Sequence, residues 1–370
     1  MVNCCKRFLS LIFLSVLVPT PVSANSLNDG AKLSGTPAQI STSSTEQTFS
    51  EIKTVGLSFD PSRSRRIKGW DHVYELLVGD GVSPDYLEKV LSDPRMPRAE
   101  TLYFAINPSE SRHLYRKHNT TRARKNALRF YRNHRDYFQA ASNAYSVPEA
   151  VILAILQVET QCGSYTGGDR VFPRLLRLAY ASAPQNVELN FQKKLRLDRS
   201  LKREAVVARA SWLEKTFLPH AAAALSVAKA KGIDPLELRG SGAGAVGLPQ
   251  FLPGHYFNFG VDADNNGVVD LYTAPDAIVS VAKYLNAHGW RKTELPPTQQ
   301  REVIWHYNHS KPYIDTVLTM AGQLAKGIEK ISAGELADEE QTSVKKAKTS
   351  RSAKSRGNYV KVKSSLSSKK

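Results

Sequence analysis

The chain has 370 residues, of which 41% are hydrophobic and 23% are charged, a composition close to the average for soluble globular proteins. This composition excludes a wholly disordered chain, a collagen-like chain and a membrane protein with several spans. Lysine and arginine number 51 against 34 acidic residues, so the formal net charge is +17 at pH 7. The excess is concentrated in residues 111–135 and 343–370, which contain no acidic residue. The rest of the chain is near neutral.

Residues 1–24 are predicted to be a signal peptide. Lys6 and Arg7 precede a mostly apolar run at 8–18, and small residues at 22–24 form a signal-peptidase site. The run is too short for a permanent membrane span, and the alternative is a buried N-terminal helix. We expect an exported, soluble protein without an integral membrane span. No cysteine stands at a lipoprotein cleavage site, and Cys162 is the one cysteine left after cleavage, which excludes an internal disulfide.

Four segments follow the signal. Residues 25–66 are rich in small polar residues and are predicted to be a flexible lead-in. Residues 67–145 show helical spacing and form an N-terminal helical region, in which 111–135 is expected to be an exposed basic helix. Residues 146–331 are mostly helical with two glycine-containing loops, and 332–370 are predicted to be a disordered basic tail.

A carboxyl group lies on the apolar face of one predicted helix. Ser146 and Glu149 fit a capping box at its start, and Gly163 is a helix stop. Glu159 follows Ile155 by four residues, so it shares the apolar stripe of this helix. Burial and the negative end of the helix dipole both raise the pKa of such a carboxyl group, which would let it act as a general acid. The alternative is a glutamate that turns to solvent at a frayed helix end.

A glycine-rich segment at 240–247 is followed by polar and aromatic residues. It lacks the βαβ context of a dinucleotide-binding loop, but its small residues allow the backbone to approach a ligand closely. Ser241 and Gln250 can hydrogen-bond a neutral polyhydroxylated ligand, and residues 305–308 and Tyr313 add aromatic faces suited to sugar rings. Taken singly, each of these aromatic residues fits the hydrophobic core better than a sugar site.

The loop at 262–273 matches the start of a calcium-binding loop. Thr273 occupies position 12, where a bidentate glutamate is expected, so calcium should bind weakly unless Asp276 substitutes for it. A metal-free turn rich in Asp and Asn is an equal alternative. The candidate metal ligands are Asp262, Asp264, Asn266 and Asp270.

Together these segments resemble the lytic murein transglycosylase B family, exported bacterial enzymes that cleave the glycan strands of peptidoglycan. The resemblance covers residues 147–325 and extends more weakly upstream to Trp70. It is carried, in the same order along the chain, by residues 158–160 with Gly163, 240–253, 262–270, 287–290 and 307–310.

The resemblance implies a mainly α, lysozyme-like fold with an inserted EF-hand-like loop and an N-terminal helical extension. It implies a periplasmic enzyme that cleaves the β-1,4 bond between N-acetylmuramic acid and N-acetylglucosamine and forms 1,6-anhydro ends. It requires no cofactor, although calcium is a candidate ligand of the 262–273 loop. It makes Glu159 the sole acid and base. It further places Ser241 and Asn308 beside that carboxyl group, and Gln250, Phe251, Tyr307 and Tyr313 at saccharide-contacting positions.

Three rival functions remain open at this point. A hydrolytic muramidase would share Glu159, although the sequence offers no convincing second carboxylate near it, as most hydrolases require. A non-catalytic peptidoglycan-binding or assembly protein would be insensitive to substitution of Glu159. A nucleic-acid binder would use the basic segments, but the export signal argues against it, and we expect no nucleic-acid partner. The basic tail is instead expected to contact anionic envelope polymers, or to be solvated without a function.

Overall fold

The structure is a computed structural model that describes residues 60–334. The predicted signal peptide, most of the lead-in and nearly all of the basic tail therefore lie outside the described residues. The lead-in was expected to reach residue 66, but helix α1 (Pro61–Arg66) already begins inside it. The Asp60 side chain accepts a 2.8 Å hydrogen bond from the Ser62 backbone N–H and so caps this helix.

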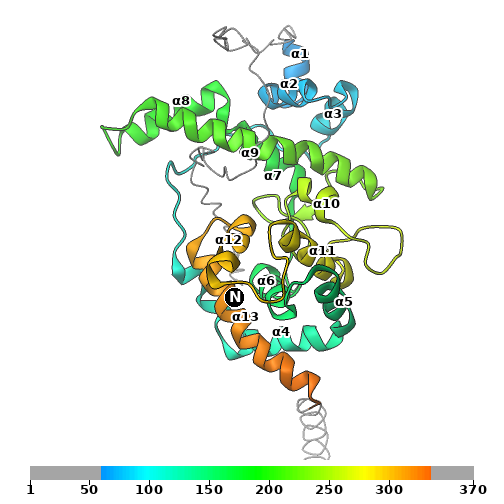
Figure 1. Cartoon of the computed structure of the whole chain (residues 1–370). Helices are drawn as coiled ribbons and strands as arrows, with labels where there is room; N and C mark the ends of the chain where they lie inside the picture. Colours follow the sequence, from blue (N-terminus) through cyan, green and yellow to red (C-terminus); the bar gives the residue numbers. More distant parts are fainter. Residues whose placement is uncertain (1–59, 335–370) are drawn as a thin grey trace, which may run out of the picture.

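A long helix, α9 (Arg203–Ala230), divides the described part of the molecule into two regions (Figure 1). On one side of it lie α1, α2 (Asp71–Gly79) and α3 (Pro84–Ser92). Helix α8 (Pro184–Leu195) forms a hairpin with α9, which extends away from the rest of the molecule. Helix α7 (Val171–Ala179) and the short helix η2 (Tyr180–Ser182) pack against the middle of α9.

On the other side, helix α6 (Glu149–Thr160) lies at the centre of a helical cluster (Figure 1). Every residue of α6 from Ala150 to Val158 is buried. A helix that is buried on all sides needs neighbours on all sides. These are η1 (Arg112–His118), α4 (Thr121–Asn133), α5 (Arg135–Tyr145), α11 (Ala274–Ala287) and α13 (Lys311–Ser332).

The loops between these helices close over one end of α6. Two short strands, β1 (Asp169–Arg170) and β2 (Arg239–Gly240), pair antiparallel and bring the glycine-rich segment beside the chain that follows α6. Helices α10 (Pro253–Phe259) and α12 (Pro297–Tyr307) complete the cluster. Within residues 60–334 these two strands are the only ones, so the described chain is mainly helical, as predicted.

The start of α6 differs from the expected capping box. Ser146 has a left-handed backbone (φ 58°) and ends the preceding helix, because its N–H donates to the Ser142 carbonyl. The N-cap of α6 is Pro148, without a side-chain hydrogen bond. Glu149 instead accepts a 2.5 Å hydrogen bond from the Tyr131 hydroxyl, which fastens α6 to α4. The capping-box prediction was therefore wrong, because Ser146 is the C-cap of α5 and Pro148 takes the N-cap position of α6.

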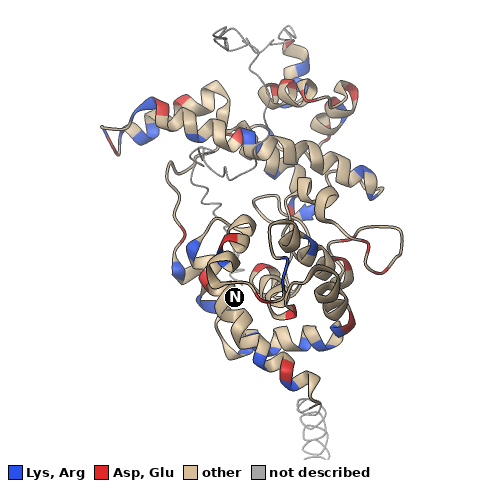
Figure 2. Ribbon diagram, in the orientation of Figure 1, with Lys and Arg blue, Asp and Glu red and all other residues tan. Residues whose placement is uncertain are grey.

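The basic segment 111–135 is not one exposed helix. It forms η1, a break, and then α4, along which Figure 2 shows several basic residues. Ala123, Ala127 and Tyr131 turn one face of α4 into the core. No helix among residues 60–334 is long and apolar enough to cross a membrane.

Candidate active site

Glu159 lies in the last turn of α6, where the helix stops abruptly. Gln161, Cys162 and Gly163 all have positive φ (51°, 55° and 82°), so the chain turns away at once. The Thr160 hydroxyl donates to the Leu248 carbonyl at 3.0 Å and accepts the Gly163 N–H at 3.0 Å. These bonds fasten the end of α6 to the segment that follows the glycine-rich loop. The backbone that carries Glu159 is therefore held firmly.

The side chain of Glu159 is partly exposed and has one hydrogen-bond partner among the described residues. The Tyr313 hydroxyl donates to its Oε1 atom at 2.6 Å. Tyr313 is itself 2% exposed and lies in the first turn of α13, whose N-cap Ser310 accepts the Tyr313 N–H at 3.3 Å. The second carboxylate oxygen, Oε2, forms no hydrogen bond with any residue between 60 and 334, so it can meet a ligand.

The surroundings of Glu159 raise its pKa towards neutral pH. Loss of solvent raises the pKa of Glu159 to about 7, the Tyr313 hydrogen bond opposes this shift, and the charge of Glu110 adds to it. At pH 7 both the acid and the carboxylate are therefore well populated. A group with this property can donate a proton in one step and accept one in the next.

Ser241 and Asn308, the expected neighbours of Glu159, form no hydrogen bond with it among residues 60–334. Ser241 is buried, and its hydroxyl accepts the Ala245 N–H at 3.1 Å within the glycine-rich turn. A Cβ atom at Gly240 would overlap the Ala245 carbonyl, which explains the glycine there. Asn308 caps the end of α12 with 8% of its surface exposed, and its Oδ1 atom has no partner. A buried amide oxygen without a partner is costly, and a bound ligand could satisfy it.

The aromatic residues of the predicted saccharide site form a layer beside Glu159. The Tyr307 ring lies parallel to that of Tyr313, with centroids 6.4 Å apart and planes at 10°. The Tyr307 hydroxyl donates to the Pro249 carbonyl at 2.6 Å. Phe251 is 2% exposed and lies behind Tyr307 and Tyr284, with centroids 5.9 and 5.4 Å away. Phe251 thus supports this layer from within, and Tyr307 is the more accessible of the two.

Gln250 lies at the turn between the glycine-rich segment and α10. It has a left-handed backbone (φ 53°), and its amide donates to the carbonyls of Thr166 and Gly247 at 3.1 and 2.8 Å. Both hydrogen bonds of the amide nitrogen thus go to backbone, and the amide oxygen has no hydrogen-bond partner within residues 60–334. Gln250 therefore holds the loops on the two sides of the site together.

Two residues of this site were not identified from the sequence. Tyr115 of η1 places its ring edge-on to Tyr313, with centroids 6.1 Å apart and planes at 76°. Glu110 accepts a hydrogen bond from the Tyr115 hydroxyl at 2.6 Å. Both lie outside every motif of the chain, and nothing in the local sequence links them to α6 or α13. Only the packing of η1 brings them to the site.

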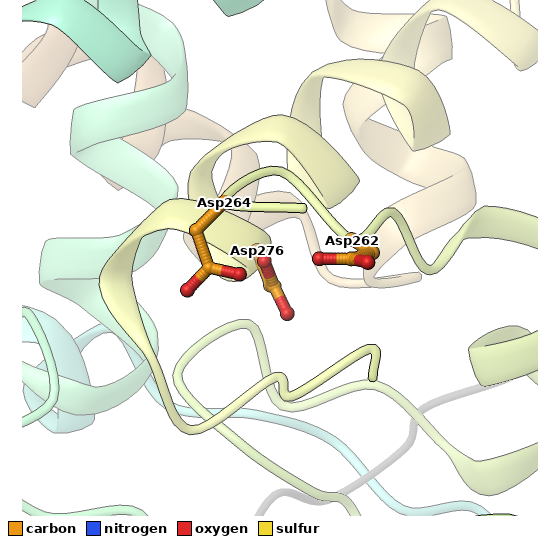
Figure 3. Close-up of side chains that lie close together, drawn as sticks. All are labelled: Asp262, Asp264 and Asp276. Atoms are coloured by element: carbon orange, nitrogen blue, oxygen red, sulfur yellow. The ribbon is translucent and has the colours of Figure 1, made fainter. Parts of the chain in front are cut away.

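The acidic loop is a separate candidate metal centre. Carboxylate oxygens of Asp262, Asp264 and Asp276 lie within 4.8 Å of one another (Figure 3). Asp276 is fully buried and accepts the N–H groups of Ala263 and Asp270 at 2.8 and 2.6 Å. Burial raises the pKa of Asp276, and the charges of Asp264 and Asp262 raise it further. Three convergent carboxylates suit a hard cation such as calcium, which would relieve this repulsion.

The other two predicted ligands have different partners. Asp270 forms an ion pair with Lys231 at 3.0 Å. The side chain of Asn266 accepts the Val268 N–H at 2.9 Å within the loop. Asp276, from the helix that follows, thus joins the carboxylate cluster in which Asp270 takes no part. The sequence could suggest Asp276 but not the lysine that pairs with Asp270.

Comparison with known proteins relates this chain to one family. The sequence model of the transglycosylase SLT domain matches residues 68–299. The membrane-bound lytic murein transglycosylase B of Escherichia coli is 33% identical over 168 residues, which are 45% of this chain and 39% of that protein. The chain thus spans about two fifths of the length of this curated relative.

Two solved structures have the same fold. The Escherichia coli lytic transglycosylase SLT35 in complex with calcium gives a TM-score of 0.52 at 21% identity, over 70% of this chain and 93% of that one. The soluble lytic transglycosylase SltB1 of Pseudomonas aeruginosa gives 0.52 at 22% identity, over 70% and 99%. These similarities confirm the predicted lysozyme-like helical fold.

Proposed function

Because this chain belongs to the transglycosylase SLT domain family, whose model matches residues 68–299, we propose that it is a peptidoglycan lytic transglycosylase. Its substrate is the glycan strand of peptidoglycan, cut at the β-1,4 bond between N-acetylmuramic acid and N-acetylglucosamine. The observation that carries this proposal is the partly buried carboxyl group of Glu159, held by the Tyr313 hydroxyl at 2.6 Å, with a pKa of about 7.

In the first step Glu159 acts as a general acid. Because Tyr313 donates to Oε1, the proton of the neutral form is carried by Oε2, which has no partner in the described part of the chain. Oε2–H protonates the glycosidic oxygen, the bond from that oxygen to C1 of the muramic acid breaks, and the N-acetylglucosamine leaves with a free 4-hydroxyl group. The N-acetyl oxygen of the muramic acid stabilises the positive charge at C1 by bonding to it.

In the second step the same residue acts as a base. The Glu159 carboxylate removes the proton of the C6 hydroxyl, O6 bonds to C1, and the N-acetyl oxygen is released. The product is a 1,6-anhydro ring, no water is consumed, and Glu159 regains its proton. Tyr313 stabilises the carboxylate between the two steps, because its hydroxyl remains a donor to Oε1.

The other predicted residues bind and orient the sugar in this proposal. Asn308 offers a buried amide oxygen without a partner, which suits the N–H of an N-acetyl group. Ser241 shapes the glycine-rich turn, in which its hydroxyl accepts the Ala245 N–H. Gln250 and Tyr307 contact the saccharide, and Phe251 supports Tyr307 through ring packing at 5.9 Å.

We also propose that the acidic loop binds calcium without taking part in the chemistry. Asp262, Asp264 and Asp276 would hold the ion, which would neutralise their charges and stiffen the loop before α11. A structural relative has been solved with calcium. We place the protein in the bacterial periplasm, where its substrate lies, with the basic tail bound to anionic envelope polymers.

The decisive experiment is mass spectrometry of the sugars released from purified sacculi. The protein should release muropeptides lighter by one water than hydrolysis products, and Glu159→Gln should release none. Glu149→Gln, at the other end of α6, is the matched control and should retain activity. Reducing-end products would instead identify a muramidase, and no release by any of these proteins would indicate a binding protein.

A further inference from the structure

The proposed reaction uses Glu159 and Tyr313 but leaves a second carboxylate nearby without a role. Glu110 lies in the segment that enters η1, and its Oε2 atom accepts the Tyr115 hydroxyl proton at 2.6 Å. Burial raises the pKa of Tyr115, and the hydrogen bond to Glu110 raises it further, so this hydroxyl keeps its proton. The bond is therefore a neutral tyrosine that donates to a charged carboxylate, the stronger class of hydrogen bond.

Tyr115 connects this carboxylate to the site. Its ring meets the Tyr313 ring edge-on, with centroids 6.1 Å apart and planes at 76°, an arrangement that aromatic pairs favour. The Tyr313 hydroxyl in turn donates to Glu159 at 2.6 Å. Two carboxyl groups thus lie at the ends of one chain of contacts, with two tyrosines between them.

The helix that carries Tyr115 is fixed to both helices of the site. Arg112 of η1 lies 3.9 Å from Asp315 of α13, two residues after Tyr313. At the other end of η1, His118 is buried, and η1 also packs against α6. The segment from 110 to 118 therefore forms a brace between α6 and α13.

We propose that Glu110 is a positioning residue of this active site: by holding Tyr115 against Tyr313, it keeps the Tyr313 hydroxyl directed at Glu159. This inference rests on the proposed function of Glu159. Without the bond to Glu110 the Tyr115 ring is held less firmly against Tyr313, and the alignment of the Tyr313 hydroxyl with Oε1 of Glu159 becomes looser.

The charge of Glu110 gives this arrangement a second effect. It raises the pKa of Glu159, because a nearby negative charge disfavours a second one. Glu110 therefore helps to keep Glu159 protonated until the substrate is bound, while the Tyr313 hydroxyl that it positions stabilises the carboxylate formed afterwards. Among the described residues Glu110 forms no hydrogen bond with Glu159 and acts through Tyr115 and through its electric field, so it is distinct from the second carboxylate of a hydrolase.

Three variants separate the two effects. Glu110→Gln removes the charge but leaves an amide oxygen that can still accept the Tyr115 hydroxyl. Glu110→Ala removes both, and Tyr115→Phe removes the hydrogen bond while keeping the ring. Glu149→Gln and Tyr131→Phe are matched controls, since they alter the same kind of tyrosine–glutamate pair at the opposite end of α6.

The first measurement is independent of activity. Carbon-13 NMR of the glutamate carboxyl groups, with the Glu159 signal assigned by its loss in Glu159→Gln, follows the titration of Glu159 directly. In Glu110→Gln its midpoint should fall by about half a pH unit. In Glu110→Ala it should fall less, because the looser Tyr313 bond opposes the effect of the lost charge, and in Glu149→Gln it should not move. An unchanged Glu159 midpoint in both Glu110 variants would overturn the inference.

The second measurement is turnover of soluble uncrosslinked glycan strands. Glu110→Ala and Tyr115→Phe should each lower kcat about tenfold with little change in KM, as expected for lost alignment. Glu110→Gln should retain most of the wild-type turnover when each protein is measured at its own pH optimum. Wild-type turnover in both Glu110→Ala and Tyr115→Phe, or a loss in Glu110→Gln as large as theirs, would refute the positioning role. If the wild-type protein releases no anhydro product, the proposed function fails, and the NMR titration alone still decides whether Glu110 and Glu159 are coupled.

Discussion

Substitution of Tyr313 by phenylalanine tests the central hydrogen bond of the site. The change removes the hydroxyl that donates to Glu159 Oε1 at 2.6 Å and keeps the ring between Tyr115 and Tyr307. This hydrogen bond lowers the pKa of Glu159 against the larger effect of burial. Its removal should therefore raise the pKa of Glu159 above its present value of about 7.

The size of the shift follows from the strength of the bond. A hydrogen bond to a charged group contributes about 1.5–3 kcal/mol, and 1.36 kcal/mol corresponds to one pKa unit. The pKa of Glu159 should thus rise by roughly one to two units in Tyr313→Phe. Because kcat/KM depends on protonated Glu159, the alkaline limb of its pH profile should move upwards by the same amount.

The assay is the rate of anhydro-muropeptide release between pH 5 and pH 10. Turnover at the optimum should fall, because the carboxylate formed in the first step loses its donor. Tyr284→Phe is the matched control, since Tyr284 belongs to the same aromatic layer but donates to the His306 carbonyl at 2.7 Å. An alkaline limb that stays in place, or moves to lower pH, would refute the reasoning about Glu159.

Three further predictions concern other parts of the molecule. Asp276→Asn should weaken calcium binding about tenfold or more, measured by calorimetry, because it removes a buried carboxylate from the loop cluster; unchanged affinity would place the ion elsewhere. Glu214→Gln should lower the free energy of unfolding by about 1–2 kcal/mol at pH 7, because Glu214 bonds His72 at 3.1 Å. The His72 bond lowers the pKa of Glu214, so the stability that this bond contributes is present above the unfolded-state pKa of about 4.3 and is lost as pH falls below it. Chemical denaturation that shows the same loss of unfolding free energy in Glu214→Gln at pH 7 and at pH 3.5 would contradict this. Deletion of residues 343–370 should weaken binding to sacculi at low salt, measured by co-sedimentation, and unchanged binding would show that the tail has no such role.

The features of the site that could be predicted depend on local periodicity. Glu159 could be placed on the apolar face of a helix near Gly163 because both the helical spacing and the stop signal lie within a few residues. The structure has this carboxyl group at the end of α6, with Thr160 as the last residue of the helix. The family and the helical fold followed from ordered motifs and are confirmed.

The features that could not be predicted depend on contacts between distant segments. Tyr115 and Glu110 reach the site only because η1 packs against α13, and helical spacing carries no information about such packing. The pairing of Asp270 with Lys231 at 3.0 Å joins the loop to the end of α9, which a loop motif does not describe. The cap expected at Ser146 failed for a related reason, since its backbone serves the preceding helix.

A single carboxyl group that must act first as an acid and then as a base needs opposing influences on its pKa. Burial alone would leave Glu159 a competent acid whose anion is too unstable to form. The Tyr313 hydroxyl alone would leave an anion too stable to take up a proton near neutral pH. The structure combines them, so the pKa of Glu159 lies at about 7. The Tyr313→Phe and Glu110→Gln variants remove influences of opposite sign, and they should therefore displace the titration of Glu159 in opposite directions.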